Sequence, residues 1–307
     1  MSWSFIRKFV KGKDKDKVRK PSKKSKEGKD KNYIFLGLPA SGKTTYFTLM
    51  AYLLQRESNK TKKFRFKFLS DERNDDADES AAIPTFSPAA AKKFISASIK
   101  QIENQKWPDK TQLDARAQYR FELLKKWASL KFRMVISYFD FPGELFEALL
   151  RQDTEKSMMI GDELRARFES AFGNAEGLFL IVDAERMFNK INSEDDDVVL
   201  SRLFDILKGK KIAILFSKVD LFFGVSALED KETLVSIFRE TYPDAYARIE
   251  DSIGNCGYFP VKAFSEIDIP EDGSDPRPPQ KVKYDKSLLT PVRWMFGFML
   301  KGIEKEQ

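Results

Sequence analysis

From residue 32 onward, short apolar runs alternate with longer stretches that carry apolar residues at helical spacing. The apolar or alternating runs predict strands at 33–36, 64–68, 118–124, 130–139, 177–182, 212–216 and 258–261. The helical spacing predicts helices at 44–56, 91–105, 163–171, 198–207, 231–239, 244–251 and 287–303. Short, continuous apolar strands alternating with helices are typical of a three-layer α/β fold, with a mostly parallel sheet covered by helices on both faces.

The first 31 residues follow a different pattern. Trp3, Phe5, Ile6, Phe9 and Val10 gather near the start, and a lysine-rich stretch with Gly, Pro and Ser follows. This composition predicts a disordered tail over 1–31, ahead of one domain over 32–307. Three readings stay open: an interfacial anchor with a polybasic patch for anionic lipid, a solubilising tail, or a docking peptide.

Charge and residue usage narrow the function classes. The chain of 307 residues carries a net charge of +7. Residues 1–31 hold thirteen Lys or Arg against four Asp or Glu, a charge of +9, so the remainder carries −2. The folded part is therefore not basic, and no specific nucleic-acid partner is expected. With no histidine, Ser-His-Asp and Cys-His catalysis are excluded. The one cysteine, Cys256, excludes an internal disulfide and fits a reducing cytosol, so a cytoplasmic protein is expected.

Residues 37–44 read Gly-Leu-Pro-Ala-Ser-Gly-Lys-Thr, between a predicted strand and a predicted helix. That spacing and context are typical of a phosphate-binding loop, whose backbone N–H groups curl inward at a helix N-terminus. Lys43 is expected to reach the β- and γ-phosphates, and the Thr44 hydroxyl to bind Mg²⁺. A glycine turn before a helix is the plainer alternative. The expected nucleotide-binding residues of this loop are Gly37, Ala40, Ser41, Gly42, Lys43, Thr44 and Thr45.

Two later strands end in polar motifs. Asp140-Phe-Pro-Gly143 follows the strand at 130–139, so Asp140 is expected to organise the metal and the Gly143 N–H to contact a γ-phosphate. Ser217-Lys218-Val219-Asp220 follows the strand at 212–216. A carboxylate at Asp220 can accept two hydrogen bonds from guanine N1 and N2, and the Lys218 stem can cover one face of the base.

In their order and spacing, these motifs resemble those of the P-loop GTPases of the translation-factor-related class, with Ras-like small GTPases as familiar members. The resemblance covers about 32–265 and implies a P-loop NTPase fold with a large insertion, about 57–116, between the first helix and the Asp140 strand. It also implies a guanine O6 contact from the Ala263 N–H, although Val261-Lys262-Ala263 matches the fifth signature poorly. The first loop, Trp107-Pro108-Asp109-Lys110-Thr111 and Pro291-x-x-Trp294 are similar to stretches of bacterial "double-GTPase" proteins, which tend to be linked with membrane-associated or conflict-system gene clusters.

Three positions depart from the family pattern. Ser217 replaces the usual Asn or Thr, although its hydroxyl can still bridge to the phosphate loop. Glu144 replaces the glutamine that orients the attacking water, so slow intrinsic hydrolysis is expected. The threonine that binds Mg²⁺ only with the γ-phosphate is expected at Thr111, with Thr85 as a competitor, and in the alternative Trp107-Pro108 is only a helix stop packed on the core. Arg116 and Arg120 are near enough in sequence to be considered as an arginine finger.

The sequence therefore predicts a GTP-binding protein that hydrolyses GTP with Mg²⁺ and acts as a molecular switch for a protein partner. Lys43, Glu144 and Thr111 are the expected catalytic residues, and Thr44, Asp140 and Thr111 the expected metal ligands. A position at the inner surface of the membrane follows if the tail is an anchor. Two alternatives stay open: a nucleotide-locked scaffold with little hydrolysis, and an ATPase or nucleotide kinase that uses the same loop.

Overall fold

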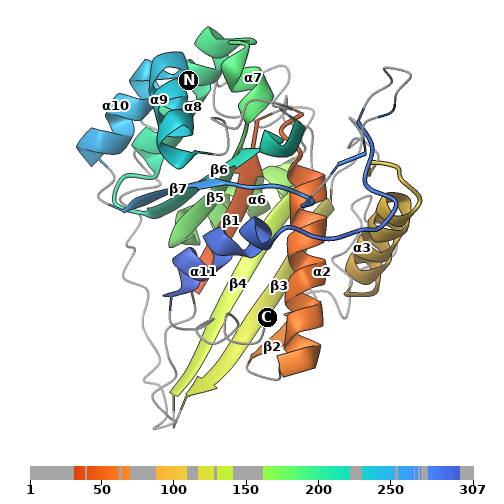
Figure 1. The fold of residues 1–307 in the computed structure, drawn as a ribbon. Helices are drawn as coiled ribbons and strands as arrows, with labels where there is room; N and C mark the ends of the chain where they lie inside the picture. The colour runs from red at the N-terminus through yellow and green to blue at the C-terminus, as the bar shows by residue number, and fades with distance from the viewer. Residues whose placement is uncertain are drawn as a thin grey trace, which may run out of the picture.

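A seven-stranded sheet forms the centre of the molecule (Figure 1). The strands are β1 (Lys31–Gly37), β2 (Arg65–Phe68), β3 (Ala117–Trp127), β4 (Leu130–Asp140), β5 (Gly177–Asp183), β6 (Lys211–Ser217) and β7 (Cys256–Pro260). Their order across the sheet is β2-β3-β4-β1-β5-β6-β7. The computed structural model describes residues 31–38, 40–61, 64–69, 88–108, 117–127, 130–140, 162–221, 230–252, 255–265, 267–268, 270 and 276–297.

Five neighbouring strands, β4, β1, β5, β6 and β7, run parallel. Only β3 runs against them, and β2 pairs antiparallel with β3 at the edge. Because these five strands are parallel, their carboxyl ends lie along the same end of the sheet, and they include Gly37, Asp140, Asp183 and Ser217. Ligands of open α/β sheets bind at the carboxyl ends of the strands.

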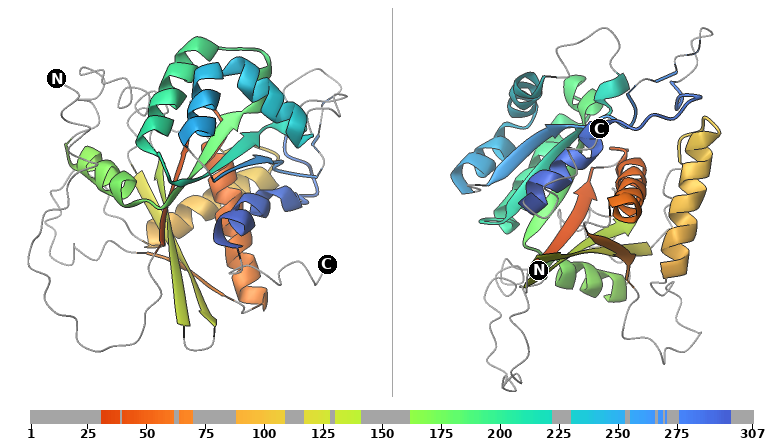
Figure 2. Two further views of the ribbon diagram at one scale, coloured as in Figure 1. Left: turned by 90° about the vertical axis from the view of Figure 1, so that its left-hand side faces the viewer. Right: turned by 60° about the horizontal axis from the view of Figure 1, so that its bottom comes forward.

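Helices cover both faces of the sheet, as Figure 1 and the two views of Figure 2 show. Alternate residues of each strand point to opposite faces, so Ile34 and Leu36 of β1 pack in one core cluster and Tyr33 and Phe35 in the other. The first face holds α6 (Asp162–Asn174), α7 (Ala184–Phe188), α8 (Ser193–Ile206), α9 (Lys231–Thr241) and α10 (Pro243–Ser252). The second holds α2 (Lys43–Thr61), α3 (Pro88–Glu103), α11 (Thr290–Phe296) and the short 3₁₀ helix η3 (Lys286–Leu289).

The predicted fold class is confirmed: the sheet is mostly parallel, helices lie on both faces, and a large segment separates α2 from β4. Each predicted strand is present. The segment after α2 supplies the edge strand β2 and the helix α3, while α2 itself runs on to Thr61. The tail expected over 1–31 lies outside the described residues except for Lys31, which begins β1.

Two further helix predictions differ from the structure. The closing helix is not continuous over 287–303, because η3 precedes α11 and Gly297, with φ of 54°, ends α11 after Phe296. The helix expected over 198–207 begins earlier, at Ser193. The first turns of this helix are acidic, and the acidic residues hid its pattern of apolar positions. Asp197 is nevertheless buried, and its carboxylate accepts hydrogen bonds from the N–H groups of Ala245 (2.8 Å) and Asp244 (3.2 Å) at the start of α10.

Within the described residues, no helix has the length and apolar character needed to cross a bilayer.

Candidate nucleotide-binding site

The loop after β1 has the backbone that a phosphate cradle requires. Ala40 and Gly42 have positive φ of 57° and 77°, and α2 begins directly afterwards at Lys43. A Cβ atom at Gly37 would stand 2.7 Å from Ser41 Oγ and 2.9 Å from the Ile181 carbonyl oxygen. Only glycine fits there, because the loop curls back over the end of its own strand.

Two side chains of the loop suit the binding of an anion. Ser41 is fully buried, and its Oγ has no hydrogen-bond partner among the described residues. The Lys43 ammonium donates to the Leu38 carbonyl oxygen at 2.9 Å, which holds a positive charge over the loop. A buried polar atom without a partner is costly, so a loop with this geometry at a helix N-terminus suits a phosphate. Thr45 follows in the first turn of α2, partly buried.

Thr44, the expected Mg²⁺ ligand, contacts a residue that sequence reasoning missed. Its Oγ1 lies 3.1 Å from the Tyr138 hydroxyl, which comes from β4. In the parallel register, Phe35 of β1 pairs with Tyr138. Gly37 and Asp140 each follow that pair by two residues, so the strand that ends at Asp140 ends beside the phosphate loop, as predicted. The Asp140 side chain, Gly143, Glu144 and Thr111 lie outside what the structure describes, as do Thr85 and Arg116. Arg120 lies on β3 and pairs with Ser137 in the register of β3 and β4.

Ser217, at the end of β6, forms the bridge expected of it. Its buried Oγ lies 2.8 Å from the Ser41 carbonyl oxygen and 3.2 Å from that of Val182, so its one proton is shared between them. The Ser-Lys-Val-Asp motif is therefore tied directly to the phosphate loop.

Lys218 takes a left-handed backbone (φ 61°) and directs its ammonium to Asp183 Oδ2 at 2.5 Å. Asp183 ends β5 and is almost fully buried. Its other oxygen caps α7 by accepting from the N–H groups of Glu185 (2.9 Å) and Arg186 (3.2 Å). Asp183 was also missed, although a polar residue that ends an apolar strand is the same signal that identified Asp140.

Asp220 and Ala263, the two residues that the resemblance assigns to polar contacts with guanine, lie together. The Ala263 N–H donates to Asp220 Oδ2 at 3.0 Å. Burial raises the pKa of the Asp220 carboxyl above 3.8, against the opposing pull of backbone N–H groups and of Lys262. This bond uses the N–H group that the resemblance assigns to guanine O6, so base binding would have to rearrange it.

Trp107 contacts the loop that follows β7, which contains Ala263 and is called the candidate base loop below. Its ring packs on Phe264 at a centroid distance of 5.7 Å, and its Nε1 donates to the Pro276 carbonyl oxygen at 2.8 Å. Gln105 adds a bond of 3.1 Å from its Nε2 to Asp268 Oδ2. The end of the segment that contains α3 therefore contacts the candidate base loop, in agreement with the alternative in which Trp107 packs on the core.

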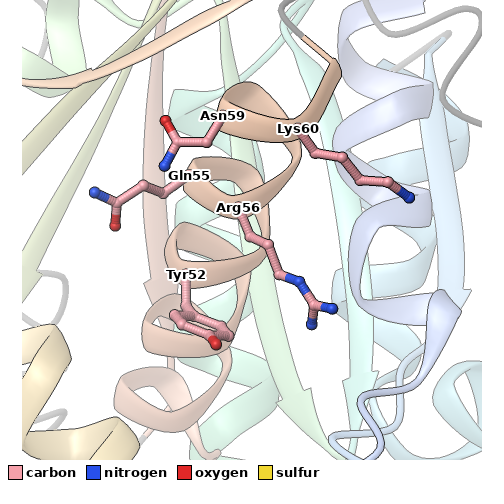
Figure 3. A pocket seen from close by; sticks show the side chains of 5 residues that line it. All are labelled: Tyr52, Gln55, Arg56, Asn59 and Lys60. Atoms are coloured by element: carbon pink, nitrogen blue, oxygen red, sulfur yellow. The ribbon is translucent and has the colours of Figure 1, made fainter.

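Two other features contribute nothing to this site. Tyr52, Gln55, Arg56, Asn59 and Lys60 line a shallow hollow of about 460 Å³, all from α2 and all beyond its first turns (Figure 3). Cys256 lies in β7, and burial raises the pKa of its thiol to about 12, which keeps it protonated and unreactive. Among the described residues, no group of three or more Cys, Asp or Glu could hold a metal ion.

No protein-family model matches the sequence, and no curated protein matches it. Solved structures that resemble it include the ADP-ribosylation factor-like GTP-binding protein, or small COPII coat GTPase Sar1, from Encephalitozoon cuniculi in complex with GDP, at 15% identity and a TM-score of 0.32. That match covers 76% of this chain and 70% of the other. The Ski7 GTPase-like domain of S. cerevisiae bound to GDP and inorganic phosphate matches at 16% identity over 76% of this chain and 43% of the other, with a TM-score of 0.33.

The Sup35 structure complexed with GMPPNP matches at 12% identity over 76% of this chain and 37% of the other, with a TM-score of 0.33. The chain therefore spans less than half of the Sup35 and Ski7 structures. Superpositions this loose carry no argument about function. The fold class rests on the chain's own mostly parallel sheet with helices on both faces, and on its Gly-x-x-x-x-Gly-Lys-Thr loop between β1 and α2.

Proposed function

We propose that this protein binds guanine nucleotides with Mg²⁺ and hydrolyses GTP to GDP and phosphate. The bond between Ser217 Oγ and the Ser41 carbonyl oxygen supports the proposal most directly. It joins a loop suited to phosphates to a motif suited to guanine, at the carboxyl ends of the parallel strands. A generic phosphate site would need the loop but not the second motif.

The proposed roles of Lys43, Thr44, Lys218 and Asp220 follow from their places in the site, and those of Asp140, Thr111 and Glu144 follow from the resemblance of their motifs. Lys43 and the N–H groups of the loop stabilise charge on the transferring phosphoryl group, while Asp220 and Lys218 hold the base. Thr44 and Asp140 would hold Mg²⁺, joined by Thr111 when the γ-phosphate is present, and the cation would neutralise developing charge on the phosphate oxygens. Glu144 is proposed to take the place of the glutamine that orients the attacking water. Because a glutamate would add negative charge close to the γ-phosphate, we expect slow hydrolysis without a partner.

An equilibrium competition experiment tests the choice of nucleotide. GTP, GDP and ATP each displace a fluorescently labelled GDP from the purified full chain, with Mg²⁺ and with EDTA. We expect GTP and GDP to compete and ATP to fail, because adenine offers no paired N1 and N2 donors to Asp220. Displacement by ATP at equal concentration would favour the ATPase or nucleotide kinase instead.

Hydrolysis is tested separately, because binding does not require it. A nucleotide-locked scaffold is the second candidate, and Glu144 in place of the usual glutamine is the observation that favours it. We expect phosphate release to be slow and a protein partner to bind more tightly with GTP than with GDP. Equal partner affinity with GTP, GDP and no nucleotide, together with no phosphate release, would favour the scaffold.

The basic tail is proposed to hold the protein at an anionic membrane surface from the cytoplasmic side. Because Lys31 begins β1 and its ammonium lies 3.9 Å from the Glu176 carboxylate, the test deletes residues 1–30 only. We expect the deletion to abolish sedimentation with phosphatidylserine vesicles and to leave nucleotide affinity unchanged. Unchanged sedimentation would remove the membrane proposal and leave the nucleotide site untouched.

A further inference from the structure

Tyr138 is a buried tyrosine whose ring is fixed from several sides. Its side chain is fully buried in β4. The ring stacks on Phe47 of α2 at a centroid distance of 4.2 Å and an interplanar angle of 23°, and meets Phe35 of β1 edge-on at 5.8 Å. Tyr119 of β3 stacks at 6.2 Å. Because these neighbours fix the ring plane, the position of the phenol oxygen is also fixed.

The phenol oxygen lies where α2 begins. It is 3.1 Å from Thr44 Oγ1, in the first turn after the phosphate loop. Phenylalanine would fill the aromatic space equally well, so packing alone does not account for the hydroxyl group. The hydroxyl group makes a polar contact with Thr44.

A threonine hydroxyl that ligates a cation gives a lone pair to the metal and must direct its proton elsewhere. The phenol oxygen of Tyr138 is an acceptor at the right distance for that proton. We propose that Tyr138 is a positioning residue for the cation site: by accepting the Thr44 proton, its hydroxyl turns the Thr44 lone pairs toward the phosphate loop. Tyr138 acts through Thr44 and does not touch the cation. The inference rests on the proposed function, since it assumes that Thr44 binds Mg²⁺.

The experiment measures how tightly the GDP complex holds Mg²⁺, without any turnover. Release of labelled GDP is followed while MgCl₂ is titrated, and the affinity for GDP is measured in EDTA. Tyr138→Phe removes one oxygen and keeps the ring. We expect it to raise the Mg²⁺ concentration that half-suppresses release by about 10-fold, the usual cost of losing a group that orients a metal ligand, while the affinity in EDTA stays unchanged.

Tyr46→Phe is the matched control. Tyr46 is buried in α2, stacks on Phe35 at 5.5 Å, and donates its hydroxyl proton to the Leu288 carbonyl oxygen at 2.6 Å. The Tyr46→Phe variant therefore loses a buried tyrosine hydroxyl from the same aromatic cluster and leaves the contact between Tyr138 and Thr44 in place. We expect its Mg²⁺ dependence to match the wild type. In Thr44→Ala, adding Tyr138→Phe should cause no further loss, because the proton to be accepted is gone.

Three results would overturn the inference: wild-type Mg²⁺ dependence in Tyr138→Phe, an equal shift in Tyr46→Phe, or additive losses in the double variant. If the wild type binds no GDP, the proposed function itself fails and the inference fails with it. If Thr44→Ala leaves the Mg²⁺ dependence unchanged, Thr44 is not a cation ligand and the inference loses its premise, while the proposed binding of guanine nucleotide stands. A Thr44→Ala effect together with a neutral Tyr138→Phe would refute the role of Tyr138 alone.

Discussion

The Lys218 ammonium lies 2.5 Å from Asp183 Oδ2, so the lysine of the candidate base motif is held by the end of the neighbouring strand β5. Lys218 has a left-handed backbone (φ 61°), which an L-residue adopts at some cost, and this ion pair helps to keep it there. The carboxylate also caps α7. One side chain therefore positions both a helix and the lysine expected to cover the base.

Asp183→Asn separates these two tasks. Asparagine caps helices as well as aspartate does, so α7 should persist, while the charge on the partner of Lys218 is lost. Because Lys218 is partly exposed, we expect guanine affinity to fall only about 3-fold. Asp230→Asn, at the exposed cap of α9, is the matched control and should leave the affinity unchanged. Competition with labelled GDP measures both, and equal affinities in the two variants would contradict this role.

Gly37→Ala should disturb both the loop and the fold. The added Cβ would lie 2.9 Å from the Ile181 backbone oxygen, which cannot turn aside. We expect the free energy of unfolding to fall by about 1–3 kcal/mol, as in overpacked cores, and nucleotide binding to be lost. Gly173→Ala in α6 is the control, because a Cβ there meets nothing within 4 Å. It should be neutral or slightly stabilising in urea denaturation; an equally stable Gly37→Ala would show that the loop is not closed over its strand.

Guanine affinity should depend on pH through Asp220. Burial raises its pKa above 3.8 in the free protein, and only the ionised carboxylate accepts from guanine N1 and N2. A raised pKa means that the free protein still holds the proton where an ordinary aspartate has lost it, so binding must release it. The affinity for GDP should therefore rise with pH below the raised pKa of Asp220 and level off above that pKa. Calorimetry in buffers of different ionisation enthalpy would detect the released proton; no proton release near the raised pKa would contradict the expectation.

Trp107 should stabilise the candidate base loop. Trp107→Phe keeps a ring against Phe264 but removes the donor to the Pro276 carbonyl oxygen. Losing about 1 kcal/mol of hydrogen bonding should speed amide exchange of Ala263 and Ser265 about 5-fold. Trp294→Phe, which lies against Phe259 and Lys211 instead, is the control. Exchange rates that respond equally to both variants, or to neither, would show that Trp107 does not hold the loop.

Much of the fold could be predicted because the apolar strands report their own positions. The runs that became β1, β5 and β6 are buried almost throughout, so their hydrophobicity is continuous and unambiguous. The hydrophobic pattern failed to predict structure where polar residues are buried together with a partner. Asp196 and Asp197 made the start of α8 look solvent-exposed, although Asp196 pairs with Arg186 at 2.9 Å and Asp197 caps α10.

For the site, residues that belong to a motif could be proposed from residue type and spacing, whereas the residues that support them could not. Gly37, Lys43 and Asp220 carry their own signal in type and spacing. Tyr138 gave none, because an aromatic residue in a strand is expected in any core, and only the approach of α2 places its hydroxyl against Thr44. The link between Trp107 and the loop after β7 likewise joins residues 169 positions apart, which no local pattern reports.

The central claim is that Asp220 makes this a guanine site, and exchanging its carboxylate for a carboxamide tests it most directly. The carboxamide introduced by Asp220→Asn would offer one acceptor and one donor, which suits the N1–H and 2-oxo groups of xanthine and leaves a guanine donor unpaired. We predict that wild-type protein prefers GDP over XDP by about 100-fold and that Asp220→Asn reverses the preference in the same competition assay. A variant that still prefers GDP, or a wild type that does not distinguish GDP from XDP, would contradict the account.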